Sequence, residues 1–106
     1  MTPRPLVLVV GNPSERRDQL AQTLIARDRA VVICNGPPGC PLIRGDHCPV
    51  VDVADLTVVL EDQTSIRETA VGLALCATSA RRSVSADVGA GRDDIVERID
   101  AALASN

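Results

Sequence analysis

The sequence predicts an α/β fold, a small three-layer domain of about four parallel strands with helices on both faces. Short aliphatic runs recur along the chain, and such runs are typical of strands that a parallel sheet buries on both faces. Between them lie stretches with the apolar spacing of helices. Because right-handed crossovers join parallel strands, this alternation places helices on both faces of the sheet. The predicted strand order is 2-1-3-4.

Four segments are predicted as strands. Residues 5–10 (PLVLVV), 30–34 (AVVIC) and 56–60 (LTVVL) are aliphatic and rich in β-branched residues, and 82–88 (RSVSADV) is a weaker example. No linker divides the 106 residues, so they are expected to form one domain, 1–106, long enough to bury a core without crosslinks. Phe, Tyr and Trp are absent, and the core must therefore be aliphatic.

Three segments are predicted as helices. The first has Asn12 as its N-cap, Pro13 at N1 and Glu15 at N3, as in a capping box. The second is expected from Ser65 to about residue 78, and the third over residues 91–105. A short turn is expected at VVDVAD, residues 50–55. On the first helix, the expected buried stripe is Leu20, Ala21, Leu24 and Ile25, and the expected wet side is Arg16, Arg17, Asp18 and Gln22.

The charges exclude several classes of function. All 11 basic residues are arginines, so a Schiff-base lysine and a P-loop lysine are both excluded. The net charge of −3 comes without a basic stripe, which argues against nucleic acid or a membrane surface as a partner. The N-terminal apolar run of about five residues is too short for a signal or spanning helix, and a cytoplasmic location is expected.

Ligands of such sheets bind at the carboxyl ends of the strands, near the point where the strand order reverses. The candidate binding residues at this rim are Gly11 and Asn12 after the first strand, and Glu61 and Asp62 after the third. Cys34 with its connection and residues 87–89 complete the predicted rim.

Three segments resemble response-regulator receiver domains, which have a flavodoxin-like fold. PLVLVVGNPSERRDQLAQTLIARDRAVVIC resembles their opening strand and helix, ADLTVVLED their third strand, and GRDDIVERIDAAL their closing helix. The resemblance implies a regulatory domain. Where the family has a metal-binding acidic pair, this chain has Gly11-Asn12, and the phosphoacceptor aspartate would fall at Leu60 or Glu61. The family's lysine is absent too, so we expect a degenerate pseudo-receiver that is not phosphorylated.

A Cys/Pro/Gly-rich connection at residues 34–52 has no counterpart in receivers. Four interpretations stay open. In the first, the thiols are reduced and structural, and in the second, Cys40 and Cys48 form a redox-active disulfide. In the third, Cys34, Cys40 and Cys48 bind zinc or an iron–sulfur cluster together with His47 or Cys76. In the fourth, Cys34 is a nucleophile. The nucleophile hypothesis lacks the arginine of the C-x₅-R phosphatase pattern, since Cys40 occupies that position.

The sequence therefore predicts a non-catalytic, receiver-like regulatory or protein-binding domain with no cofactor. Its expected partner is another protein or a second copy of the chain. The alternative is a thiol-based redox or metal sensor that uses Cys34, Cys40 and Cys48, with zinc or an iron–sulfur cluster as the cofactor in the metal case. An enzyme is not expected, because the lone His47 has no serine placed to be its nucleophile.

Overall fold

The structure is a computed structural model, and it describes residues 4–11, 14–34, 48–61, 75, 78, 80–87, 89 and 91–104, without the side chain of Glu61. Strands and helices alternate along the described chain. Their order is β1 (Leu6–Val10), α1 (Glu15–Ala26), β2 (Ala30–Cys34), α2 (Pro49–Val53), β3 (Leu56–Glu61), β4 (Ser83–Asp87) and α4 (Arg92–Ala104).

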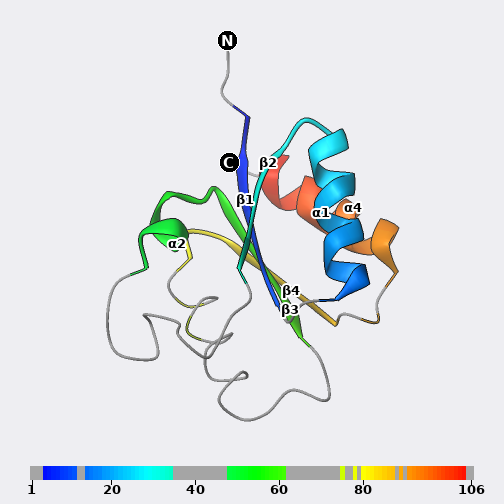
Figure 1. The fold of residues 1–106 in the computed structure, drawn as a ribbon. Helices are drawn as coiled ribbons and strands as arrows, with labels where there is room; N and C mark the ends of the chain where they lie inside the picture. Colours follow the sequence, from blue (N-terminus) through cyan, green and yellow to red (C-terminus); the bar gives the residue numbers. More distant parts are fainter. Residues whose placement is uncertain are drawn as a thin grey trace.

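The four strands form one parallel sheet in the order β2-β1-β3-β4 (Figure 1). This confirms the predicted fold class and strand order, and the order matches the first four strands of a flavodoxin-like sheet. In register, Val9 of β1 lies between Ile33 of β2 and Val58 of β3. The order reverses between β1 and β3, so the rim after these two strands is the place where this fold binds ligands.

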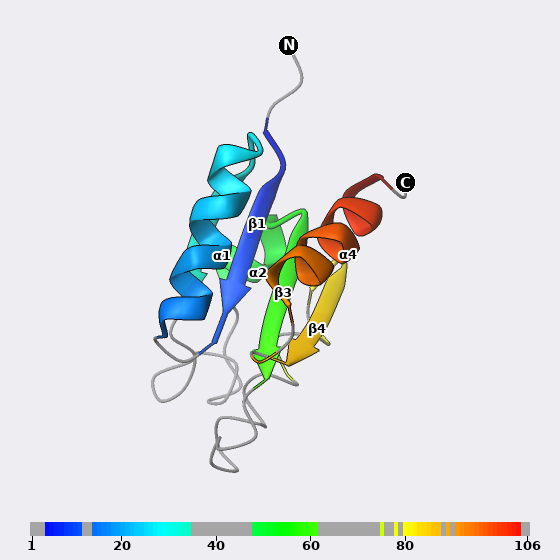
Figure 2. The ribbon, with the colours of Figure 1, turned by 90° about the vertical axis from the view of Figure 1, so that its right-hand side faces the viewer.

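Helices cover both faces of the sheet, so the fold has three layers (Figures 1 and 2). Successive side chains of a strand point to opposite faces, and β1 therefore supplies both cores. Val7 and Val9 pack with α1 and α4, in the core cluster that contains Leu24 and Ile99. Leu8 and Val10 pack on the other face with Val51 of α2.

The predicted elements agree with the structure at most positions. The strand at 30–34 has the predicted bounds; β1 and β3 differ from the prediction by one residue at one end, and β4 by one residue at each end. The turn expected at 50–55 is the short helix α2. The helix expected from Ser65 to about 78 lies outside the described residues, except that Leu75 and Thr78 have helical backbone.

The predicted start of the first helix is wrong. Ser14 is the N-cap of α1: its backbone is extended, and its Oγ accepts a hydrogen bond from the N–H of Arg17 at 3.1 Å. Serine caps as well as asparagine does, and here its hydroxyl reaches the N3 amide. Glu15 therefore occupies N1 instead of N3, while Asn12 and Pro13 lie outside the described residues.

The buried stripe of α1 also differs from the prediction. Leu20, Ala21 and Leu24 are buried, but Ile25 is 55% exposed. Ile25 lies at the border of the stripe, one residue after the buried Leu24. Because β2 is the edge strand of the described sheet, no further strand of that sheet lies beyond it to cover Ile25.

Thr57 is a buried polar residue in the middle of β3. It is 0% exposed, and its Oγ1 has no hydrogen-bond partner among the residues that the structure describes. An unpaired buried hydroxyl costs free energy, and valine has nearly the same shape. We expect Thr57→Val to raise the free energy of unfolding by about 1 kcal/mol, measured by urea denaturation.

The control is Thr23→Val on α1. Thr23 is half-buried, and its Oγ1 donates to the carbonyl oxygen of Gln19 in a hydrogen bond that is exposed to solvent. We expect this change to stay within about 0.5 kcal/mol of the wild type. If Thr57→Val instead lowered the stability, the hydroxyl would have a partner and our description of this position would be wrong.

Candidate functional site

The carboxyl ends of the strands meet at one edge of the sheet, the rim that the sequence nominates. The N–H of Gly11, directly after β1, donates to the carbonyl oxygen of Cys34 at the end of β2, at 3.1 Å. Glu61 of β3 is in register with Asp87 of β4. The rim therefore joins four segments that are distant in the sequence. Asn12 and Asp62 lie outside the described residues, and ligand binding at this rim stays a prediction.

Gly11 lies against β3. A Cβ atom at this position would be 3.1 Å from the Cβ of Leu60, closer than ordinary van der Waals contact. Leu60 is itself buried in the core. Glycine therefore lets the chain leave β1 close to β3, at the reversal of strand order.

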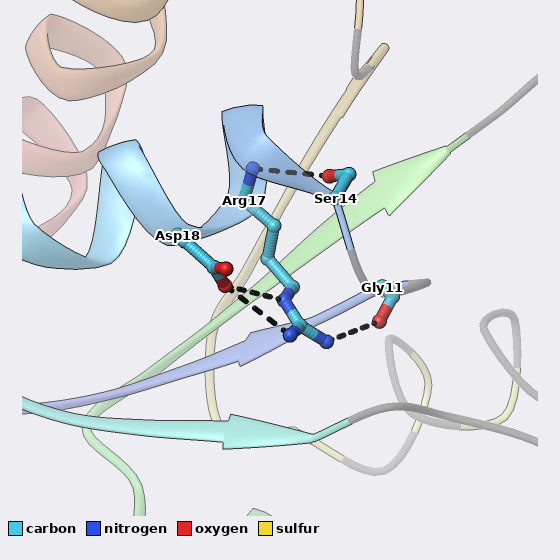
Figure 3. Close-up of polar contacts among 4 residues, drawn as sticks. All are labelled: Gly11, Ser14, Arg17 and Asp18. Atoms are coloured by element: carbon cyan, nitrogen blue, oxygen red, sulfur yellow. Dashed lines mark hydrogen bonds and ion pairs between the residues drawn. The ribbon is translucent and has the colours of Figure 1, made fainter.

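The guanidinium of Arg17 is buried beneath this rim (Figure 3). Its side chain is 9% exposed. Nη1 donates to the carbonyl oxygen of Gly11 at 3.2 Å, while Nε and Nη2 donate to Oδ1 of Asp18 at 3.3 and 3.2 Å. Figure 3 shows the side chain extending from α1 toward the end of β1. Arg17 thus links the first turn of α1 to the residue that follows β1.

This position corrects the prediction that Arg17 lies on the wet side of α1. Arg17 shares the buried face with Leu20, Ala21 and Leu24. The spacing of three, four and seven residues is the signal that could have found it, because it continues the apolar stripe by one turn toward the N-terminus. Polarity alone favours a solvent position for Arg17, but a long side chain can be buried when its head group finds partners.

The buried guanidinium limits the chemistry of the rim. It carries a fixed positive charge, and it already donates to the carbonyl oxygen of Gly11. A divalent cation needs several oxygen ligands and is repelled by a neighbouring positive charge. The carbonyl oxygen of Gly11 therefore already accepts a hydrogen bond from a charged donor, whose charge is partly balanced by Asp18.

A groove of about 520 Å³ lies beside the rim, between the first turns of α1 and α4. Leu20 and Ile95 contribute its apolar surface. Each helix lines the groove with one acid and one base: Glu15 and Arg16 from α1, and Asp93 and Arg92 from α4. The formal charges of these four side chains sum to zero, so the groove has no excess of acidic or basic side chains.

The connection after β4 is tied to α1. The N–H of Gly89 donates to Oδ1 of Asp87 at 2.7 Å, and Nη1 of Arg16 donates to the carbonyl oxygen of Gly89 at 3.3 Å. These bonds fix the predicted rim residues 87 and 89 relative to the first turn of α1. They define backbone geometry and do not by themselves form a ligand site.

Two of the four cysteines lie in described segments. Cys34 ends β2 and Cys48 is the N-cap residue of α2; both are half-buried, and both contact the core cluster of Leu8, Val10 and Val51. Cys40 and His47 lie outside the described residues, so the disulfide of Cys40 with Cys48 and the metal set with Cys34 and His47 stay predictions. Among the residues that are described, no three potential ligands of the His, Cys, Asp or Glu type cluster around one point.

In the described part of the chain, no helix has both the length and the apolar character needed to cross a membrane. No protein-family model and no curated protein matches the chain. It is similar to a solved structure, that of a response regulator receiver protein from Pseudomonas putida. The identity is 22%, the match covers 94% of this chain and 81% of that chain, and the TM-score is 0.49. The strand order and the two covered faces of the sheet define the fold independently of this similarity.

Proposed function

We propose that the chain is a receiver-like regulatory domain that works by binding another protein chain, without turnover, without a cofactor and without phosphorylation. The observation that carries this proposal is the buried Arg17 at the rim. In the family that the chain resembles, a cation-binding acidic pair occupies the positions of Gly11 and Asn12. In this chain the guanidinium of Arg17 donates to the carbonyl oxygen of Gly11 instead.

The residues at the end of β3, where the resemblance places the family's phosphoacceptor aspartate, support the same proposal. Phosphoryl transfer needs an acceptor, a cation and positive groups arranged around the transferred phosphoryl oxygens. At this position Leu60 is 4% exposed and packs against Gly11, and the next residue is Glu61. The chain also contains no lysine. A small phosphodonor would therefore find neither a bound cation nor an aspartate acceptor at the family's position.

We expect the chain to stay unmodified when it is incubated with acetyl phosphate and Mg²⁺. The measurement is intact-protein mass spectrometry, with a receiver domain that has the acidic pair and the lysine as a positive control. Mg²⁺ should also leave the melting temperature unchanged, because a cation that binds only the folded state would raise it. A hydroxylamine-labile phosphoryl adduct, or a clear rise in melting temperature with Mg²⁺, would contradict the proposal.

The thiol-sensor alternative is supported by the contact of Cys34 and Cys48 with the same apolar cluster, because a change at either thiol would reach the core beneath the rim. Mass spectrometry of the native protein with and without reductant tests it. A loss of two hydrogens on oxidation, or retained zinc, would support a sensor. If the chain holds no metal and its thiols stay reduced after treatment with a mild oxidant, the thiols are structural and the sensor alternative is wrong.

A further inference from the structure

The outer edge of β4 presents backbone groups to a further strand. β4 is the last strand of the described sheet on its side, and Figure 2 shows it as the outermost one. The N–H of Thr57 in β3 donates to the carbonyl oxygen of Arg82, so residue 82 directs its backbone groups toward β3. Because this direction alternates along a strand, Ser83, Ser85 and Asp87 direct their N–H and C=O groups away from the described sheet.

The side chains of β4 divide between a covered face and an open one. Val84 and Ala86 are buried in the core cluster beneath α4. Ser83, Ser85 and Asp87 point to the opposite face, and all three are exposed. Up to Ala86 the strand contains no charge, proline or glycine, which are the residues that usually block pairing at an edge.

The two ends of β4 carry opposite charges on this open face. Arg81 directly precedes Arg82 and Asp87 ends the strand, and both side chains are exposed. Arg82 reaches α4, where its Nη1 donates to the carbonyl oxygen of Ala102. Arg81, one residue earlier, therefore points to the other face, together with Asp87. In the part of the chain that the structure describes, neither Arg81 nor Asp87 forms an ion pair.

A second copy of β4 is a neighbour that these charges fit. Antiparallel pairing with Val84 opposite Val84 places Arg81 of each copy directly opposite Asp87 of the other. It also places Ser83 opposite Ser85, and cross-strand pairs of opposite charges or of hydroxyls stabilise a sheet. A parallel copy in the same register would instead place like charges side by side. The open face of β4 is therefore complementary to itself in the antiparallel direction.

We propose that two copies of the chain pair through antiparallel β4 strands, giving one continuous sheet with four strands from each copy. The outward backbone groups allow this register and the charges select it. Ser83 of one copy exchanges two hydrogen bonds with Ser85 of the other, and the reverse pair does the same, so the two-fold axis passes at Val84. Two ion pairs of Arg81 with Asp87 lie on either side of the axis. The inference rests on the proposed binding function, for which it names the partner and the surface.

Sedimentation over a dilution series tests the dimer. We expect the wild type to form a dimer that dissociates on dilution, and added NaCl should raise the dissociation constant, because exposed ion pairs are screened. Arg81→Asp and Asp87→Arg should each raise it by about tenfold or more, since each replaces two pairs of opposite charges by two pairs of like charges. The matched control is Glu15→Arg, which reverses an exposed acid on α1, beside β2 at the other edge of the sheet. It should leave the dissociation constant near the wild-type value.

An equimolar mixture of the two reversal variants tests the register. One variant has an acid at both positions and the other has an arginine at both, so their heterodimer regains two pairs of opposite charges. We expect the mixture to dimerise at a concentration at which each variant alone is monomeric. A mixture that stays monomeric there, although the wild type dimerises, would show that Arg81 and Asp87 do not meet across the axis and would overturn the proposal.

A backbone variant and a measurement on the wild type keep the test valid if a reversal variant fails to fold. Ser85→Pro removes one outward N–H and leaves the bonds of β4 to β3 in place, so it should fold and lose the dimer. In the wild type, amide exchange of Ser83 and Ser85 should be slow in the dimer and should speed up on dilution. A wild type that is monomeric at every concentration, or a folded Ser85→Pro variant that dimerises like the wild type, would overturn the proposal.

The outcomes separate this inference from the proposed function. A monomer that acquires no phosphoryl group would overturn the β4 dimer and leave the proposed binding function to a different protein partner. A β4 dimer that is phosphorylated by acetyl phosphate would confirm the dimer and overturn the proposed absence of phosphorylation.

Discussion

Replacement of Ile99 by alanine is expected to lower the free energy of unfolding by about 3–4 kcal/mol. Ile99 of α4 is 0% exposed and belongs to the core cluster that joins α4 to β1, β3 and α1. Removing three carbon atoms there loses burial and leaves a cavity that the rigid sheet cannot fill. Because the chain contains no aromatic residue, unfolding in guanidinium chloride is followed by circular dichroism.

The control for this prediction is Ile25→Ala, the same substitution on α1. Ile25 is 55% exposed, so its loss should cost less than about 1 kcal/mol. Both variants are compared with the wild type at a dilution at which the chain is monomeric. Equal losses at the two positions would show that α4 does not pack on the sheet as described.

The strands were predictable because their signal is local. A parallel sheet buries both faces of its central strands, and the runs at 5–10 and 56–60 are aliphatic at nearly every position. The strand at 82–88 alternates instead, and in the structure β4 buries only Val84 and Ala86. Helices that alternate with such runs leave few topologies, and the predicted strand order 2-1-3-4 is one that right-handed crossover connections allow.

The start of α1 could not be read from the sequence, because NPSER contains two residues that cap helices equally well. Asn12 offers a capping box with Glu15, and Ser14 offers a hydroxyl to the N–H of Arg17. The choice depends on tertiary packing. With Ser14 as the cap, α1 buries Arg17 together with Leu20, and the guanidinium reaches the carbonyl oxygen of Gly11.

The candidate site was predictable only in its position. The ends of parallel strands define the rim, and Gly11 and Glu61 lie there as expected. The cysteine connection has no apolar periodicity, so the sequence leaves several chemistries open for it, and most of the connection lies outside the described residues. Cys34 and Cys48 contact the core through the elements that carry them, β2 and α2, which were themselves predicted as a strand and a turn.

Arg17→Met is expected to lower the free energy of unfolding by about 2 kcal/mol. Methionine keeps the length and the apolar contacts of the side chain but cannot donate a hydrogen bond. The carbonyl oxygen of Gly11 would lose its charged donor, and Asp18 would lose both of the bonds it accepts from Arg17. Urea denaturation at low protein concentration, compared with the wild type, gives the difference directly.

Two matched variants separate the geometry of this contact from its charge. Arg17→Lys keeps the positive charge, but a compact ammonium cannot reproduce the planar fork that reaches Gly11 and Asp18 together, so we expect it to lose about 1 kcal/mol. Arg16→Met removes an exposed neighbouring guanidinium and should cost less than about 0.5 kcal/mol. Full stability in Arg17→Met would mean that the guanidinium does not hold the end of β1 to α1 and is no obstacle to a cation at the rim.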